Sequence, residues 1–242
     1  MQARWIGFCR RALFAGLTAW ALAGHAPAIL AGPAALNDQG TFELSIKGDP
    51  IGAERFQIIP EGDRIRARAE IELRTQKEGK TLVSHSFPDL VLDSQLRPLS
   101  YIWALKGAGN SRLEIDFTTM PARALYHTVN GKNDRREFLL PKDVLVLDDN
   151  VLSQYEILVE RYDQTSRGQQ LFSAFIPQEA LPGKIKISET GVEPVRINGQ
   201  SKSLRHLVVT TDLARIDLWA DAQGRLWRVS VPALRFEAVR QK

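Results

Sequence analysis

The stretch RIRARAEIELR, residues 64–74, alternates charged and apolar side chains without interruption. Side chains on a β-strand point alternately to opposite faces, so this pattern predicts an antiparallel strand with one buried and one solvated face. Four arginines and two glutamates share the charged face, which we interpret as a solvated surface with weak cross-strand ion pairs. The apolar face carries Ile65, Ala67, Ala69, Ile71 and Leu73.

Ala67 and Ala69 are the two small residues in the middle of this otherwise large apolar face. They leave room for another element to come close to the sheet. We expect a helix to pack there as part of the core, with any ligand cavity displaced towards the open end of the sheet. The alternative is that a ligand fills the space beside the two alanines.

Strand-like runs separated by turn signals continue the pattern on both sides. TFELSIK, IGAERFQII and the opening stretch are linked by KGDP and PEGD. Such short links join antiparallel neighbours, whereas parallel pairing needs long crossovers that the sequence lacks. About a dozen strands exceed what a flat sheet usually holds, so we expect a curled antiparallel meander, either a barrel or a half-barrel, or a sheet split into two layers.

One segment, LDDNVLSQYEILVERYD at residues 147–163, breaks the β rhythm. Its apolar residues recur at helical spacing, and Asp148, Asp149 and Asn150 offer capping side chains ahead of them. The segment predicts one amphipathic helix near 149–162, with Tyr155 and Leu158 facing the sheet. Its opposite face is polar and consists of Ser153, Gln154, Glu156, Glu160 and Arg161.

The first 31 residues have the pattern of a signal peptide. Arg4, Arg10 and Arg11 form a basic start, an uncharged apolar run over 12–23 follows, and small residues come next. The run is short for a membrane span, which needs roughly 20 apolar residues. We therefore expect cleavage after Ala23 or near Ala31, a linker over 32–39, a single antiparallel β domain over 40–242, and a periplasmic or secreted mature protein.

Removal of this segment changes the charge and the cysteine content. The formal charge of the chain is +4, and loss of three arginines lowers it to about +1, so we expect no nucleic-acid partner. The single cysteine, Cys9, lies within the removed segment. The mature chain therefore has no thiol for a disulfide, a nucleophile or a metal site.

The hairpin ARIDLWADAQGRLWRVSV, residues 214–231, contains two tryptophans. A four-residue DAQG turn predicts that Asp221 opposes Arg225 and that Trp219 opposes Trp227 across the strands. Such a pair stabilises a sheet, or it forms a stacking platform for a sugar ring, an aromatic ligand or an apolar tail. The candidate ligand-binding residues are Trp219, Trp227, Tyr155 and Trp103.

No sequence motif identifies a catalytic residue, and we expect neither a metal nor a cofactor. The chain lacks a G-x-S-x-G elbow, an H-E-x-x-H motif, a phosphate loop and a dinucleotide glycine pattern. His85, His127 and His206 are isolated in the sequence, and Asp148 and Asp149 are interpreted as helix caps. These observations favour a non-enzyme and leave catalysis open, because antiparallel strands can bring distant residues together.

A resemblance rests on four stretches, IGAERFQI, LDDNVLSQYEILVERYD, FSAFIPQE and IDLWADAQGRLWRVSVP. They resemble an uncharacterised family of secreted bacterial β-rich proteins, a domain of unknown function. An exported meander with a helix set against it is also similar to the periplasmic Lol-type lipoprotein carriers. The second likeness implies a half-open barrel with an apolar cavity.

Together these features favour an exported binding or carrier protein for an apolar or lipid-like ligand. The alternatives are a hydrolase or lyase acting on an envelope polymer, and a structural or assembly factor working through its surface or sheet edges. Transient contact with the membrane or with envelope proteins is expected in the first case.

Overall fold

The computed structural model describes residues 36–241, except 78, 108–109, 128–130, 132, 167 and 212–213. The expected signal peptide and most of the expected linker lie outside the described residues. Within them, fifteen strands form one sheet. The first eight strands are β1 (Asp38–Ile46), β2 (Asp49–Glu61), β3 (Arg64–Lys77), β4 (Lys80–Asp93), β5 (Pro98–Gly107), β6 (Ser111–Asp116), β7 (Ala122–His127) and β8 (Asn133–Phe138).

The second arm of the sheet begins with β9 and carries the helix. Its strands are β9 (Leu145–Val146), β10 (Gln170–Ile176), β11 (Leu181–Ile197), β12 (Gln200–Thr210), β13 (Arg215–Ala220), β14 (Leu226–Val231) and β15 (Phe236–Arg240). The helix α1 (Gln154–Arg161) lies between β9 and β10, and two short 3₁₀ turns, η1 (Pro177–Glu179) and η2 (Pro232–Leu234), precede β11 and β15. None of the helices in the described part of the chain is long and apolar enough to cross a membrane.

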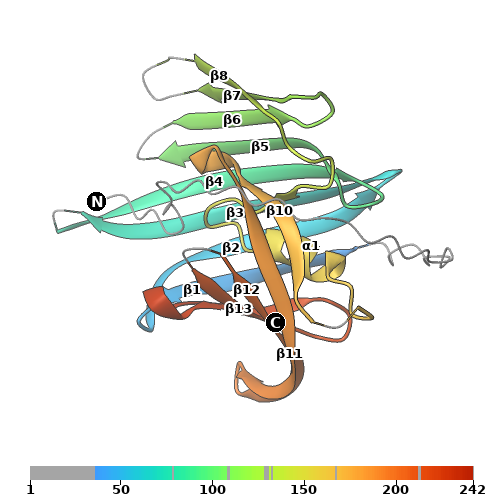
Figure 1. Ribbon diagram of the computed structural model, residues 1–242. Coiled ribbons are helices and arrows are strands. Elements are labelled where there is room, and N and C mark those ends of the chain that lie inside the picture. The colour runs from blue at the N-terminus through green and yellow to red at the C-terminus, as the bar shows by residue number, and fades with distance from the viewer. Residues whose placement is uncertain are drawn as a thin grey trace, which may run out of the picture.

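The two arms join through the pairing of β1 with β15. β1 pairs with β2 on one side and with β15 on the other, so the order runs from β8 through β1 and β15 to β9. Neighbouring strands are antiparallel except for the short β9–β10 pair. The sheet curls without closing, and β10 and β11 pass in front of α1 in Figure 1. The predicted curled antiparallel meander with one helix is confirmed, in its half-open form.

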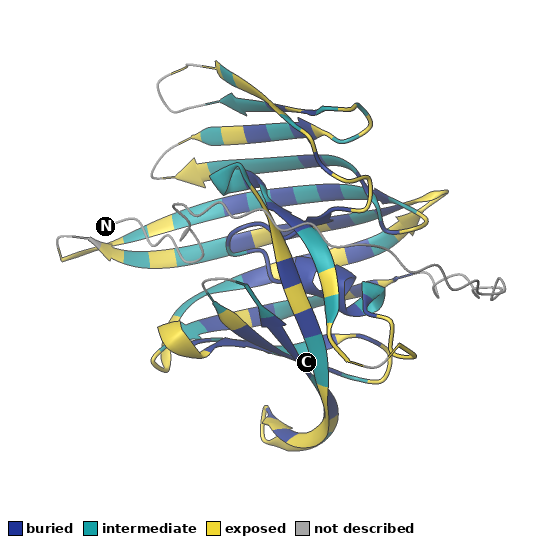
Figure 2. Cartoon of the chain, viewed as in Figure 1, coloured by how far each residue is buried: buried dark blue, intermediate teal, exposed yellow. Residues whose placement is uncertain are grey.

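The opening stretch forms β3, as predicted. Ile65, Ala67, Ala69 and Ile71 are buried in the main core, while the arginines of the other face are partly or fully exposed (Figure 2). Arg66 donates to Asp89 of β4 at 2.8 and 2.6 Å, which is one of the expected cross-strand ion pairs. Such a half-buried surface pair contributes about 0–1 kcal/mol, so burial of the apolar face stabilises this strand more than its charges do.

The helix begins at Gln154, later than predicted, and the expected aspartate cap is wrong. The N-cap residue is Ser153, and its side chain makes no capping bond. The Asp148 carboxylate instead accepts hydrogen bonds from the Tyr101 hydroxyl at 2.6 Å and from the Gln178 N–H at 2.9 Å. These partners lie on other elements, so local capping propensity did not decide where the helix starts.

The polar face of α1 is also largely buried. Ser153, Gln154 and Glu156 are each at most 2% exposed, because the curled sheet encloses the helix on more than one side. Glu160 and Arg161 alone of that predicted face keep intermediate exposure. α1 is therefore a buried plug within the curled sheet (Figure 2).

A second, smaller apolar cluster lies on the outer face of the second arm. The tip of the β11–β12 hairpin reaches β15, where the Asn198 side-chain amide donates to the Arg240 carbonyl at 3.0 Å. We call this group the outer cluster. Its buried members are Val195, Ile197, Leu204 and Trp219, with Trp227 and Val239 packed against them.

Candidate functional site

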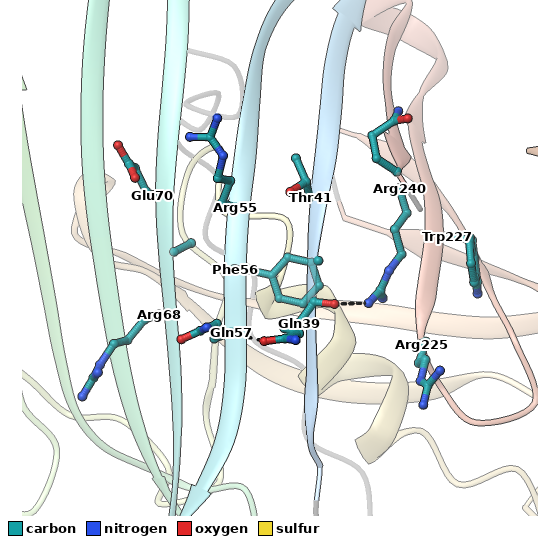
Figure 3. A pocket seen from close by; sticks show the side chains of 13 residues that line it. Gln39, Thr41, Arg55, Phe56, Gln57, Arg68, Glu70, Arg225, Trp227 and Arg240 are labelled. Carbon is teal, nitrogen blue, oxygen red and sulfur yellow. Dashed lines mark hydrogen bonds between the residues drawn. The ribbon is translucent and has the colours of Figure 1, made fainter. Parts of the chain in front are cut away.

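A groove of about 700 Å³ runs across the outer face of β1, β2 and β3 and ends at β14 and β15. Two rows of paired, outward-pointing residues form its walls: Gln39, Gln57 and Arg68 in one row, and Thr41, Arg55 and Glu70 in the other. Figure 3 shows these side chains on their strands. The remaining lining residues are Gly40, Phe56, Ala69, Arg225, Trp227, Arg240 and Gln241.

The walls of the groove carry more positive than negative charge. Arg55 and Arg225 are exposed, and neither makes an ion pair or a side-chain hydrogen bond within the described part of the chain. Arg68 has distant acidic partners, with N–O distances of 3.4 Å to Glu61 and 3.6 Å to Asp89. Glu70 is the single carboxylate in the lining. The groove is therefore a basic site with two uncompensated guanidinium groups.

Trp227 forms the aromatic end of the groove. Its indole lies under the Lys202 ammonium, 3.8 Å from the ring centroid, and its N–H donates to Asp221 at 2.9 Å. Asp221 is close to the groove, but backbone N–H groups of Gln223 and Arg225 also donate to its carboxylate. Trp227 thus joins the basic groove to the apolar outer cluster.

Arg240 occupies the boundary between the groove and the interior. Its guanidinium donates to Asp38 at 2.6 and 2.7 Å and to Glu156 of α1 at 3.1 Å. Burial would raise the pKa of Asp38, but the hydrogen bonds from Arg240 outweigh it and hold that pKa below its usual value. Burial, followed by the neighbouring Asp38 carboxylate, raises the pKa of Glu156 well above its usual value. Asp38, Arg240 and Glu156 therefore connect α1 to β1 and to β15, the first and last strands described.

The interior contains buried acidic residues, among them Glu54, which the sequence analysis missed, and Asp148, which it interpreted as a helix cap. Burial raises the pKa of Glu54 to about 7 and that of Asp148 to about 6. Perturbed carboxyl groups are common in active sites. Here Glu54 and Asp148 are closed to solvent, at 0% and 1% exposure, and already bonded to the segment that leads into α1. The geometry therefore supports an anchoring role. The signal for Glu54 was an acidic residue in the inward register of IGAERFQII.

The structure does not pair the two tryptophans of the predicted hairpin. Asp221 N–H bonds the Arg225 carbonyl as expected, but Trp219 lies opposite Arg228 because a bulge shifts the register between Trp219 and Ala220. The expected Trp219–Trp227 pairing is therefore wrong, although both indoles belong to the outer cluster.

Trp219 is in a different environment from Trp227. It is 9% exposed, stacks on His206 with ring centroids 4.7 Å apart, and donates to Glu193 at 2.6 Å. Trp227 alone of the four predicted ligand-binding residues lines the groove.

Tyr155 and Trp103 lie away from the groove. Tyr155 lines a small apolar pocket of about 20 Å³ beside Ile216 and Val229, a volume close to that of a single water-sized probe. Trp103 is partly buried against the main core, opposite Pro88 and Leu113 on the neighbouring strands. The structure therefore does not bring the four predicted residues into one site.

His85, His127 and His206 each have separate neighbours. His85 lies 3.7 Å from Glu70, and Oδ1 of Asn133 accepts a hydrogen bond from Nδ1 of His127 at 2.9 Å. His206 bonds Asp217 at 2.8 Å. No group of three or more His, Cys, Asp or Glu residues suited to a metal ion occurs among residues the structure describes.

Comparison with solved structures places this fold beside a protein of unknown function. A β-barrel-like protein of the domain of unknown function DUF1849, from Brucella abortus, matches with a TM-score of 0.59 and 9% identity over 85% of this chain and 96% of that chain. A DUF1089 family protein from Pseudomonas aeruginosa matches with a TM-score of 0.44 and 13% identity over 90% and 97% of the two chains.

Sequence comparisons add nothing further. No family model matches the chain, and no curated protein matches it. The Brucella match shows a shared fold alone, at this level of identity. The chain therefore has the fold of an uncharacterised β-barrel-like protein.

Proposed function

We propose that this is an exported binding protein for an anionic, lipid-like ligand whose acidic headgroup binds in the outer groove. One observation carries the proposal: the guanidinium groups of Arg55 and Arg225 are left without an acidic partner among the described residues, in a groove of about 700 Å³. Ligand sites in proteins are typically ~300–1,000 Å³ in volume, so the groove has room for a headgroup.

The polar lining suits a phosphate-bearing headgroup. A guanidinium presents parallel N–H donors that match two oxygens of a phosphate, and the bond is strengthened by charge on both sides. Gln39, Gln57 and Gln241 add neutral amide groups that can bond glycerol or sugar hydroxyls. The headgroup would thus meet charged donors and neutral amides together.

The half-buried indole of Trp227 is the apolar group of the groove that could meet the apolar part of the ligand. Trp227 packs against the outer cluster, and a tryptophan ring suits the boundary between a wet and an apolar environment. The basic, apolar and small-residue segments of the first 31 residues support export to the envelope, where such amphiphiles occur. The groove would then bind the headgroup while the apolar chains remain near Trp227.

The lining supports binding more than hydrolysis. Its ionisable side chains are Arg55, Arg68, Arg225 and Arg240, with Glu70 as the carboxylate. An acid–base reaction needs a proton donor and acceptor placed on either side of the reacting bond. The arginines supply positive charge but remain protonated, so the set is suited to holding an anion.

Sedimentation with lipid vesicles tests this function. The mature protein is expected to co-sediment with phosphatidylglycerol vesicles and not with phosphatidylcholine vesicles, and added salt should weaken the binding. Arg55→Gln combined with Arg225→Gln should abolish most of it. The matched control is Arg123→Gln with Arg135→Gln, which removes the same charge from exposed positions on β7 and β8. Equal binding to both kinds of vesicle would contradict the proposal.

A further inference from the structure

Arg240 connects the groove on the outer face with the helix inside the curled sheet. It lines the groove, yet its guanidinium also bonds Glu156 of α1 at 3.1 Å. Glu156 has a second link to the sheet, since one of its carboxylate oxygens accepts the Leu226 N–H at 3.4 Å. One side chain therefore contacts both the candidate ligand site and the plug.

The position of this guanidinium is set from several directions. It lies 5.3 Å from the ring centroid of Phe56 and 5.6 Å from that of Trp227, both of which line the groove. It also donates to the Gln39 carbonyl at 2.6 Å, as Figure 3 shows. A change in the charge or occupancy of the groove therefore acts directly on the group that holds Glu156.

Gly40 makes room for this arrangement. A Cβ atom added at Gly40 would lie 2.9 Å from Nη2 of Arg240. The backbone of Gly40 is not in the left-handed region, so the close approach of the arginine is the reason for a glycine here. The guanidinium of Arg240 can therefore lie against the backbone of residue 40 because that residue has no Cβ atom.

We propose that Arg240 couples the groove to α1, so that an anionic headgroup bound in the groove weakens the docking of the helix. This inference rests on the proposed function. The incoming anion competes with Asp38 and Glu156 for the same guanidinium and repels both carboxyl groups if they are ionised. Thermodynamic linkage requires the reverse effect too: weaker docking of α1 favours anion binding.

Loosening of α1 has a defined consequence in the core. The helix and the turn before it contribute Val151, Leu152 and Tyr155 to the small apolar pocket of the second arm. The same turn stays anchored by Glu54, which accepts the Leu152 N–H at 2.6 Å. Glu156 lies in the first turn of α1, directly after the two residues that Glu54 holds. The coupled motion is therefore a loosening of α1 from its first turn onward, while Leu152 and Ser153 stay bound to Glu54.

Hydrogen exchange with and without a defined probe tests the coupling. The probe is dihexanoylphosphatidylglycerol at saturation, with inorganic phosphate in a parallel arm to separate a lipid headgroup from free phosphate. Amides of residues 154–161 are expected to exchange about tenfold faster with the lipid probe bound. In Glu156→Gln the same amides should already exchange faster, the probe should bind at least as tightly, and its addition should change little.

Two results would overturn the coupling in different ways. Tight probe binding to the wild-type protein without any change in the exchange of residues 154–161 refutes the coupling and leaves the proposed function standing. Failure of both the lipid and inorganic phosphate to bind refutes the coupling and the proposed function together. Binding of inorganic phosphate alone, with faster exchange, supports the coupling and refutes the lipid-like ligand.

Two separate glycine substitutions, a test and its control, give an independent test that needs no ligand. Gly40→Ala should displace the flexible end of Arg240 and speed the exchange of residues 154–161, because Glu156 loses its partner. Gly183→Ala is the matched control, since a Cβ at Gly183 meets nothing within 4 Å. A folded Gly40→Ala protein whose α1 exchanges at the wild-type rate would refute the role of Arg240.

Discussion

Glu54 accepts the backbone N–H of Ser153 at 3.0 Å, although 99 residues separate the two along the chain. The same carboxylate accepts the Leu152 N–H at 2.6 Å. The first N–H groups of a helix have no partner within it, and an acceptor there stabilises the helix start. A strand of the first arm therefore caps the helix of the second arm and fixes α1 inside the curled sheet.

The protonation of Glu54 should make stability depend on pH. Burial raises its pKa to about 7 in the folded state from 4.5, so the folded protein retains a proton that the unfolded chain releases. The resulting stabilisation is complete below about pH 4.5 and is lost as the pH rises through about 7. The free energy of unfolding of the wild type relative to Glu54→Gln should therefore be roughly 1–3 kcal/mol higher at pH 5 than at pH 8.

Urea unfolding at the two pH values measures this difference. Glu43→Gln is the control, because Glu43 is exposed on the neighbouring strand. Its effect on stability should be small and nearly the same at both pH values. The prediction would be contradicted if Glu54→Gln also changed the free energy of unfolding by the same amount at pH 5 and at pH 8. The Glu54 carboxyl would then titrate as it does in the unfolded chain.

The bond between Tyr101 and Asp148 should matter more than an ordinary tyrosine hydrogen bond. The Tyr101 hydroxyl donates to Oδ2 of Asp148 at 2.6 Å, and this carboxylate is 1% exposed. Tyr101→Phe should lower the free energy of unfolding by roughly 1–3 kcal/mol, because a buried charged acceptor loses its donor. Burial raises the pKa of Asp148 to about 6, and loss of this bond should raise it further.

Tyr126→Phe provides the comparison for that variant. The Tyr126 hydroxyl donates to the Pro177 carbonyl at 3.0 Å in a partly buried setting. Its loss should cost roughly 0.5–1.5 kcal/mol. Thermal or urea unfolding of both variants checks that Tyr101→Phe loses more free energy of unfolding than Tyr126→Phe. An equal or larger loss for Tyr126→Phe would contradict an anchoring role for Asp148.

Ala69→Leu should overpack the inner face of β3. Ala69 is 9% exposed and pairs with Phe56, whose ring stacks on Phe42 with centroids 5.3 Å apart. Added methylenes in a packed core cost roughly 1–3 kcal/mol, so the midpoint of urea unfolding should fall. Ala53→Leu, at a partly exposed outward position on β2, should change it little. Unchanged stability for Ala69→Leu would reveal empty space beside the alanines.

Much of the fold could be predicted from short-range pattern. The alternation over 64–74 predicts a strand with the correct buried face, because register on a half-buried strand is fixed by which side chains are apolar. The helical spacing around Tyr155 and Leu158 correctly places a helix and two of its buried residues. Both features depend on neighbours within a few residues.

The errors concern contacts between distant segments. Asp148 looked like a helix cap, but Tyr101 and Gln178 bind it, and Glu54 takes over the capping role. Trp219 and Trp227 were expected to form a cross-strand pair, but a bulge after Trp219 shifts the register and places Trp219 opposite Arg228. The groove could not be predicted, because Arg55 and Arg225 line the same groove only through the pairing of β1 with β15 and of β15 with β14.

Export is expected to remove the amino terminus of the chain. The basic start, short apolar run and small residues before Ala31 predict cleavage by a signal peptidase. Sequencing the amino terminus of protein isolated from the cell envelope should give a start just after Ala23 or near Ala31. A mature chain that still begins at Met1 would contradict export by cleavage.

Binding of a soluble acidic lipid to the groove tests the central claim most directly. Calorimetric titration with monomeric dihexanoylphosphatidylglycerol should show one site per chain. Arg55→Gln with Arg225→Gln should weaken it at least tenfold, which corresponds to about 1.4 kcal/mol. The control Arg123→Gln with Arg135→Gln should bind as the wild type does. Equal weakening in both double variants, or no binding by the wild type, would contradict a specific anionic-lipid site in the groove.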